Sequence, residues 1–277
     1  MEKRIGGLLV EVAPPERPKF KSPLLMVHGL WSGSWCWRQW ATDFSNLGWE
    51  CWAINFKGRL EREAHRILKE LTLSDCVADL QAVISAASFP PVLIGHSIGG
   101  LIALKAAERE KLSALVLLSV LPPSGIELVR SRQLRLLRLK YWPLVLLGRP
   151  FRPEAKDLRP SWIASVPAPM QADIMSRIFP DSAHLFAHFF VRRRVAVDPA
   201  RISCPTLATG GSDDRVVPVE TLRDTARRLG SDFKEYPGHG HWLMGEGGGA
   251  EIVREIHRWV VQGLGEEILL APFSEER

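Results

Sequence analysis

The chain has 277 residues, of which 46% are hydrophobic, and its formal net charge is +5. This length and composition suffice for a sizeable core and predict one domain with an insertion. The longest apolar runs, such as SALVLLSVL, fall short of the roughly 20 residues that cross a bilayer, and the modest positive charge disfavours a dedicated nucleic-acid binder.

Short apolar runs alternate with amphipathic stretches of helix length, which is typical of a mostly parallel sheet covered by helices on both faces. The start, MEKRIGGLLVEVAPPERP, has Glu11 inside its apolar stretch and no small-residue cleavage site, so we interpret it as an ordinary first strand and not a secretion signal. Further strands are predicted at 23–28, 49–54, 92–96, 114–120, 206–210 and 232–236. Helices are predicted at 34–47, 73–88, 98–110, 219–229 and 248–263.

The alternation stops at Pro122, where proline-punctuated helical patterns rich in Trp, Phe, Leu and Arg begin. An insertion of this length between two core strands predicts a mainly helical cap, or lid, over residues 122–202. The core is then formed by 1–121 and 203–277. Within the insertion, residues 128–153 carry seven basic side chains and no acidic one. We interpret this stretch as an amphipathic helix on the core, with attachment to anionic lipid or a preference for an acidic or lipid-like substrate as the alternative.

The stretch VLIGHSIGG, residues 92–100, places Ser97 between two glycines directly after an apolar strand. Gly-x-Ser-x-Gly at such a junction forms a sharp turn that lifts the hydroxyl above the sheet edge, and Gly95 and Gly99 leave room for it. The alternative is a polar residue at the start of a buried helix, because glycine-flanked helix starts also occur in cofactor-binding proteins. The choice depends on partners elsewhere in the chain.

A serine hydroxyl becomes a good nucleophile when a histidine, oriented by a carboxylate, takes its proton. The stretch LATGGSDDRVVP puts Asp213 and Asp214 beyond an apolar strand, and EYPGHGHWLMGE puts His239 and His241 beyond the last strand. Carboxylate and imidazole are thus expected at the same carboxyl edge of the sheet as Ser97, in the chain order serine, acid, histidine.

These motifs resemble the α/β-hydrolase family, along residues 22–121 and 203–262. The resemblance implies Asp214 as the acid, because it is the fourth residue of a Gly-x-x-Asp-x-x-Val-Pro stretch. It implies His241 as the base, because an aromatic residue follows it a few positions before a glutamate. Asp213 and His239 remain the alternatives.

An oxyanion hole is also expected. The backbone N–H of Ile98, directly after the serine, is one expected donor, and the resemblance implies the Leu30 N–H, in the loop that ends the stretch LLMVHGLW, as the other. Gly29 lets the backbone approach the substrate. We interpret His28 as a histidine that organises this loop and not as the base.

The stretch HGLWSGSWCW is similar to the His-Gly-x-x-x-Gly-x-Trp-x-Trp loop of the plant methylesterase and hydroxynitrile lyase group. The lyases of that group have Thr at the position of Gly29 and Lys at the position of Trp242, so hydrolysis is favoured. The stretch NFKGR departs from the Asp-x-x-Gly of many hydrolases and leaves Lys57 and Arg59 without a role implied by the family. The insertion is also longer than in the plant group.

The sequence therefore predicts a serine hydrolase that cleaves carboxylic esters of small molecules through an acyl-enzyme intermediate. Ser97, His241 and Asp214 form the predicted triad, and Trp31 and Trp242 are predicted to line the substrate pocket. The alternatives are a lipase, of the monoacylglycerol-lipase type, for longer acyl chains and a ligand receptor without turnover on the same fold.

No cofactor, metal or nucleic-acid partner is predicted, and the oligomeric state is left open. The four cysteines are scattered without CxxC spacing, which disfavours a zinc ribbon or a redox pair and fits a reducing cytoplasm. They are Cys36, Cys51, Cys76 and Cys204.

Overall fold

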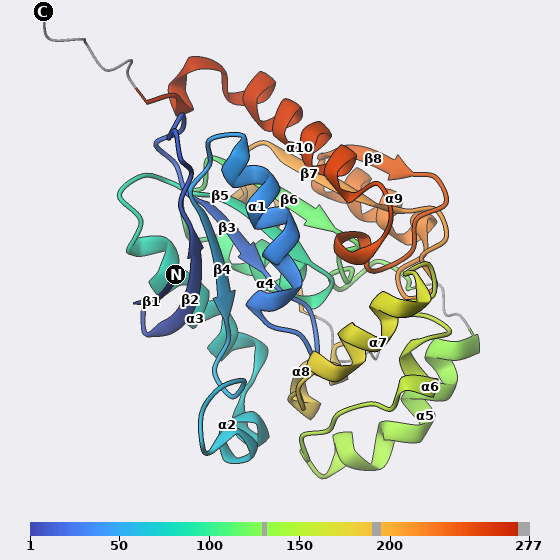
Figure 1. The fold of residues 1–277 in the computed structure, drawn as a ribbon. Coiled ribbons are helices and arrows are strands. Elements are labelled where there is room, and N and C mark those ends of the chain that lie inside the picture. Colours follow the sequence, from blue (N-terminus) through green and yellow to red (C-terminus); the bar gives the residue numbers. More distant parts are fainter. Residues whose placement is uncertain (129–131, 190–194, 271–277) are drawn as a thin grey trace, which may run out of the picture.

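The centre of the protein is an eight-stranded sheet of order β1-β2-β4-β3-β5-β6-β7-β8 (Figure 1). It is seen in a computed structural model that describes residues 1–128, 132–189 and 195–270. The strands are β1 (Glu2–Ile5), β2 (Leu8–Ala13), β3 (Leu24–Val27), β4 (Cys51–Asn55), β5 (Val92–His96), β6 (Ala114–Leu118), β7 (Thr206–Gly211) and β8 (Asp232–Tyr236).

Neighbouring strands from β4 to β8 are parallel, whereas β1 and β2 pair antiparallel at one edge. Every residue of β5 and β6 is buried. Their continuous apolar runs are explained by helices on both faces of the sheet, since a strand covered on both sides needs no polar alternation. The predicted fold class, a mostly parallel sheet flanked by helices, is confirmed.

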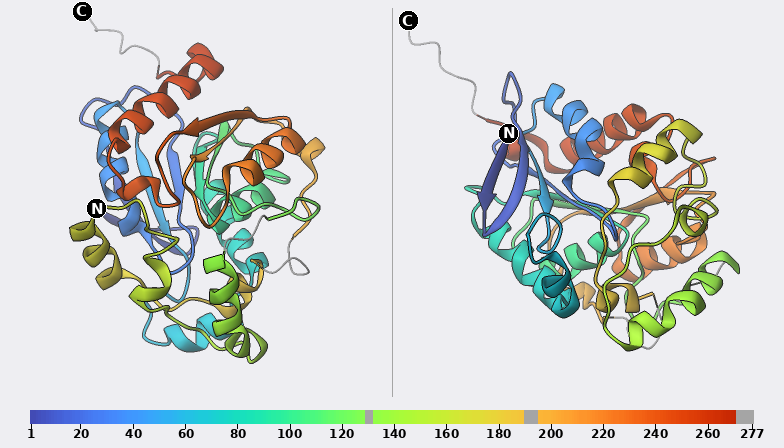
Figure 2. Two further views of the ribbon diagram at one scale, coloured as in Figure 1. Left: turned by 90° about the vertical axis from the view of Figure 1, so that its right-hand side faces the viewer. Right: turned by 60° about the horizontal axis from the view of Figure 1, so that its bottom comes forward.

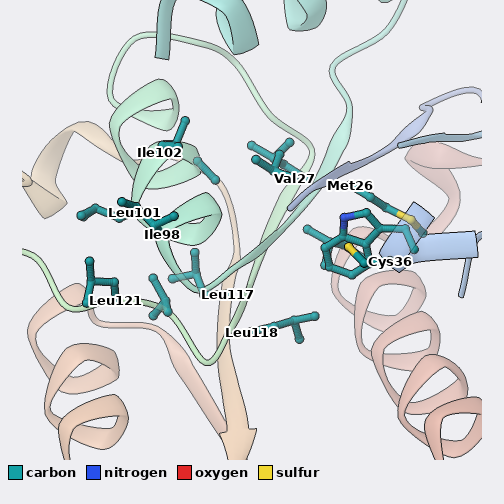
Figure 3. Close-up of a cluster of buried hydrophobic side chains, with 14 of the residues drawn as sticks. Met26, Val27, Cys36, Ile98, Leu101, Ile102, Leu117, Leu118 and Leu121 are labelled. Atoms are coloured by element: carbon teal, nitrogen blue, oxygen red, sulfur yellow. The ribbon is translucent and has the colours of Figure 1, made fainter. Parts of the chain in front are cut away.

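Helices α1 (Arg38–Asn46) and α10 (Gly249–Leu264) lie on one face of the sheet, and α3 (Leu73–Ser85) and α4 (Ile98–Ala107) lie on the other (Figure 2). The other α-helices of the described ranges are α2 (Ala64–Glu70), α5 (Arg132–Leu146), α6 (Ala155–Leu158), α7 (Ala168–Arg177), α8 (Ala183–Ala187) and α9 (Val219–Leu229). Helix α4 is buried along almost its whole length. Figure 3 shows its residues Ile98 and Leu101 beside Leu117 of β6 in the core.

The N-terminal segment forms two strands where the sequence predicted one. Gly6 and Gly7 have φ of +57° and +85°. Two consecutive residues with positive φ make the tight turn of a hairpin, which most side chains resist and glycine accepts. Helix α2 was not predicted, because Leu68 is its one buried residue and the apolar signal is weak.

The described residues between β6 and β7 form α5 to α8 and add no strand to the sheet. These helices lie beyond the carboxyl ends of the parallel strands, at the lower right of Figure 1. An isolated bridge between Phe151 and Asp181 links the two parts of this segment. In the described ranges, no helix is both long and apolar enough to cross a membrane.

We expect two glycine substitutions to have opposite effects on stability. A Cβ at Gly263, near the end of α10, meets no atom within 4 Å, so Gly263→Ala should raise the free energy of unfolding by about 0.5 kcal/mol through helix propensity. A Cβ at Gly99 would lie 2.6 Å from the Val27 carbonyl oxygen, so Gly99→Ala should lower it by about 3 kcal/mol or more. Urea unfolding measures both, and a Gly99→Ala protein of wild-type stability would contradict the packing described.

Candidate active site

Ser97 occupies a strained turn between β5 and α4, with φ +56° and ψ −122°. A non-glycine residue in this region costs free energy and is held there by its surroundings, a condition that clusters at functional sites. The Ser97 N–H donates to the Leu118 carbonyl at 2.9 Å, and the Leu121 N–H donates to the Ser97 carbonyl at 3.1 Å. The segment at the end of β6 thus fixes both backbone groups of the serine.

The side chains of Ser97, His241 and Asp214 form a continuous hydrogen-bonded chain. The His241 Nε2 atom lies 3.1 Å from the Ser97 Oγ, and its Nδ1 lies 2.8 Å from the Asp214 Oδ2. The His241 and Asp214 side chains are 0% and 1% exposed. Because Nδ1–H donates to the carboxylate, the Nε2 lone pair faces the hydroxyl and can accept its proton.

Asp214 is itself oriented by the backbone. Its Oδ1 accepts hydrogen bonds from the N–H groups of Val216 and Val217, at 2.7 and 2.9 Å. One carboxylate oxygen is therefore bound to the turn after β7, and the other is left for the imidazole. Such support restricts the rotation of the carboxylate and thereby the ring that it holds.

The two alternative residues point to other partners. The Asp213 Oδ1 accepts a hydrogen bond from the Ser212 hydroxyl at 2.8 Å. The His239 Nδ1 lies 3.2 Å from the Glu246 Oε2. The pKa of Glu246 is raised overall, because the effect of burial exceeds the opposing effect of His239. Of the candidate acids and bases, the structure brings Asp214 and His241, and not Asp213 and His239, to Ser97.

The two expected oxyanion donors lie on segments that meet at Ser97. Ile98 begins α4, where the first N–H groups of a helix have no partner within the helix. The loop that contains Leu30 passes close to the serine, because a Cβ on Gly29 would lie 3.2 Å from the Ser97 Cβ. Neither the Leu30 nor the Ile98 N–H donates to another residue in the described part of the chain, so both can serve a ligand.

Two buried histidines support the neighbouring backbone. The His28 Nδ1–H donates to the Gly29 carbonyl at 2.8 Å, and the His96 Nε2–H donates to the His241 carbonyl at 2.8 Å. Burial lowers the pKa of His28 to about 3, helped by the Arg59 guanidinium. Burial also lowers the pKa of His96 well below its usual value, helped by His241. Both rings are therefore neutral, and their contacts are those of residues that organise loops.

Trp31 and Trp242, the predicted pocket residues, pack in different surroundings. The Trp31 ring is buried and lies edge-on to Trp162 at 5.3 Å between ring centroids. The Trp242 ring stacks on Trp35 at 6.0 Å. Trp162 also lies edge-on to the His241 ring at 5.9 Å, a contact that no motif in the sequence indicated. A pocket role for Trp31 and Trp242 stays a prediction.

Potential metal ligands and cysteines are the last groups to consider in the described part of the chain. Among the residues that the structure describes, no three or more His, Cys, Asp or Glu side chains gather in a way that could hold a metal ion. The four cysteines are free thiols. Burial raises the pKa of Cys36, Cys51 and Cys76, which keeps these thiols protonated and unreactive.

We expect the neutral histidines to make stability depend on pH. Unfolded histidine titrates near pH 6.5, whereas His28 and His96 stay neutral in the folded state, so the unfolded state binds more protons as pH falls. The free energy of unfolding should drop by about 2 kcal/mol per histidine between pH 7 and pH 5. Urea unfolding at several pH values should show a shallower slope for His28→Gln. The exposed His65→Gln is the control, and equal slopes for the two variants would contradict the expectation.

Comparisons with known proteins agree with the fold. The model of the Alpha/beta hydrolase family matches residues 24–255. Among curated proteins, a carbendazim hydrolyzing esterase from Nocardioides sp. (strain SG-4G) is 32% identical over 102 residues. That match covers 36% of this chain and 42% of the relative, so the chain spans less than half of the relative's length.

Solved structures of esterases superpose on nearly the whole chain. A thermophilic esterase from Thermogutta terrifontis gives a TM-score of 0.71 at 20% identity, covering 95% of this chain and 98% of that one. An esterase from Rhodococcus sp. ECU1013 gives 0.69 at 16% identity, with the same coverage of 95% and 98%. At these identities the likeness shows a shared fold. Together with the family model, which spans most of the chain, it shows that the protein belongs to the alpha/beta hydrolase family.

Proposed function

We propose that the protein is a serine hydrolase that cleaves carboxylic esters of small molecules through an acyl-enzyme intermediate. The observation that carries the proposal is the hydrogen-bonded chain from Ser97 through His241 to Asp214. The Leu30 and Ile98 N–H groups beside the serine, which have no acceptor among the described residues, add a place for a developing oxyanion. The named activity of the Nocardioides relative, an esterase, is consistent with this assignment.

In the first half of the reaction, the Ser97 Oγ attacks the ester carbonyl carbon while His241 Nε2 takes the hydroxyl proton. The carbonyl oxygen becomes an oxyanion that accepts hydrogen bonds from the Leu30 and Ile98 N–H groups. Asp214 stabilises the imidazolium and keeps Nδ1 protonated. When the tetrahedral intermediate collapses, the bond to the alcohol oxygen breaks, and His241 returns its proton to that oxygen.

In the second half, a water molecule gives a proton to His241 Nε2 and attacks the acyl carbon of the ester on Ser97. The same two N–H groups stabilise the second oxyanion. Collapse breaks the bond to Ser97 Oγ, which recovers the proton from His241, and the carboxylic acid leaves. Every step uses groups of the chain, the substrate and water.

The segment 122–202 would act as a cap over this site. Its Trp162 contacts the His241 ring, so part of the segment already borders the proposed catalytic centre. Trp31 would form a wall between cap and core, because its ring packs against Trp162 and Phe151. Trp242, which follows His241, would line the opposite side.

We expect ester turnover to depend on Ser97. Steady-state hydrolysis of p-nitrophenyl esters from acetate to palmitate, with carbendazim as a further substrate, would be compared for wild type and Ser97→Ala. Removal of the nucleophile should lower kcat by about 10⁴-fold or more. The exposed Ser176→Ala on α7 is the matched control and should keep wild-type rates. A Ser97→Ala protein of undiminished activity would exclude the mechanism.

Two pairs of neighbouring residues sharpen the same assay. Asp214→Asn should lower kcat by about 10³-fold or more, whereas Asp213→Asn should change it little. Likewise, His241→Gln should lower kcat strongly, whereas His239→Gln should change it little. A wild type that gives one burst without further turnover would instead favour a ligand receptor on this fold.

Helix α5 favours a second candidate, action on lipid-like substrates at an anionic membrane. Four leucines on the outward side of α5 or directly after it are 57%, 74%, 62% and 63% exposed. They are, in this order, Leu136, Leu139, Leu146 and Leu147. Trp142 is 42% exposed, and Leu134, Leu137 and Tyr141 are buried on the opposite side of the helix. The helix lies at the periphery of the molecule (Figure 2).

The stretch that contains this apolar face is basic in sequence, which would complement an anionic surface, although Lys140 pairs with Glu154 and Asp157. Residues 128–153 carry seven basic side chains and no acidic one, which exceeds the net charge of +5 for the whole chain. Arg135 and Arg149 are exposed close to the leucines. Apolar side chains flanked by cations bind the interface of anionic bilayers, where leucines enter the acyl region and arginines meet phosphates.

We expect the protein to bind phosphatidylglycerol vesicles more tightly than phosphatidylcholine vesicles. Leu139→Glu should weaken binding to the anionic vesicles by about 10-fold, because it places a negative charge at the centre of the apolar face. Phe89→Glu, at an exposed position on the loop before β5, is the control for the same change of charge. Sedimentation with vesicles measures both, and equal binding of the two variants would remove the membrane hypothesis.

A further inference from the structure

A buried ion pair joins the segment 122–202 to the core. The Arg59 guanidinium, in the loop after β4, lies 2.7 Å from the Asp181 Oδ2, between α7 and α8, and each side chain is 1% exposed. Burying two charges is costly, and such a pair persists when its geometry is good and further hydrogen bonds satisfy it. Neither side chain belongs to the proposed triad. The role of the ion pair must therefore come from the other groups that it contacts.

The remaining contacts of Asp181 converge on one residue. The Asp181 Oδ2 also accepts a hydrogen bond from the Trp31 N–H at 2.8 Å. The Phe179 N–H donates to the Trp31 carbonyl at 2.9 Å. Residues 179–181 therefore bind both backbone groups of Trp31. The Asp181 Oδ1 is occupied by the Ser182 N–H at 2.7 Å, so the carboxylate is fixed on both oxygens.

Trp31 needs this support because its backbone is strained. Its φ is +58°, in the left-handed region that a bulky side chain disfavours. It directly follows Leu30, and the Trp31 N–H belongs to the peptide that begins at the Leu30 carbonyl. The orientation of this peptide constrains Leu30, whose own N–H is a proposed oxyanion donor.

Arg59 extends the same support to the neighbouring residue. Its Nε lies 3.5 Å from the Ser32 carbonyl, and its Nη1 donates to the Lys57 carbonyl at 3.2 Å. One guanidinium thus connects the loop after β4, Asp181 and the loop 29–32, which we name the oxyanion loop. The Asp181 backbone is in turn paired with Phe151, at 2.9 and 3.1 Å.

We propose that Asp181 and Arg59 are positioning residues, which hold the oxyanion loop so that the Leu30 N–H faces the carbonyl oxygen of the substrate. Asp181 supplies the acceptor for the Trp31 N–H, and Arg59 holds and neutralises that acceptor in the buried site. Through Asp181, which belongs to neither the proposed triad nor the oxyanion donors, the segment 122–202 thereby controls the competence of the oxyanion hole. The inference rests on the proposed ester hydrolysis for its catalytic consequence, but its structural part can be tested without turnover.

Two uncharged double variants separate positioning from stability. Arg59→Met with Asp181→Asn keeps an oxygen acceptor for the Trp31 N–H, whereas Arg59→Met with Asp181→Leu removes it. Both remove the buried charges together, which avoids the loss of stability that follows when one charge is left alone. A purely structural pair would give two variants of similar kcat.

We expect the variant with Leu to lose about 10²-fold in kcat with less than a threefold change in KM, and the variant with Asn to stay within about 10-fold of wild type. Affinity for a trifluoromethyl ketone, whose serine adduct carries an oxyanion, should fall in parallel with kcat/KM. Lys57→Met with Asp79→Leu removes a neighbouring ion pair, at 2.6 Å, between the loop after β4 and α3, and should leave kcat unchanged. Equal kcat in the two Arg59 and Asp181 double variants would overturn the proposal.

Hydrogen exchange of the Leu30 and Trp31 amides, measured by NMR, tests the loop even if the protein has no ester turnover. The variant with Leu should exchange the Trp31 amide at least about 10-fold faster than wild type, with β5 amides unchanged. Asp181→Glu keeps the charge but shifts the carboxylate, so it should also speed exchange of the Trp31 amide. This variant replaces the Leu variant in the test if the Leu variant does not fold. Wild-type exchange at Trp31 would exclude positioning. If the wild type shows no turnover that depends on Ser97, the hydrolase function is excluded, but the positioning of the loop by Asp181 is not.

Discussion

The contact between the start of α4 and the end of β3 is the constraint on which the site depends. A side chain at Gly99 would overlap the carbonyl oxygens of Val27 and His28, so hydrogen alone fits there. This approach brings the first N–H groups of α4 and the loop after β3 to the same point. Ser97 lies at that point with a strained, positive φ, and its hydroxyl faces His241. The proposed nucleophile and the proposed oxyanion donors therefore lie together because the backbones of α4 and of the loop after β3 touch.

Much of this arrangement follows from the sequence. The apolar runs at β5, β6 and β7 predict buried parallel strands, and parallel strands end at one edge of a sheet. The side chains that follow β5, β7 and β8 must then lie together, which brought Ser97, Asp214 and His241 into the prediction. The choice between Asp213 and Asp214 rested on resemblance. The structure explains it by the N–H groups of Val216 and Val217, which hold one oxygen of Asp214.

Other features could not be predicted, because they depend on contacts between residues far apart in the chain. Asp181 is 150 positions from Trp31, and it lies in an irregular stretch between two short helices without periodicity. Trp162 likewise reaches His241 through the folding of the insertion. Arg59 departs from the pattern of many hydrolases, and its partner became visible when the insertion was seen folded against the core. Sequence patterns within a segment predict strands and motifs. Hydrogen bonds and packing between distant segments become apparent only in the folded structure.

Covalent labelling of Ser97 is the decisive experiment for the proposed catalytic triad. A fluorophosphonate, which reacts with activated serines, would be incubated with the protein, and the adduct would be located by mass spectrometry of its peptides. We expect one adduct, on Ser97, formed by the wild type and strongly diminished in His241→Gln. An adduct on another residue, or equal labelling of the two proteins, would contradict a serine activated by His241.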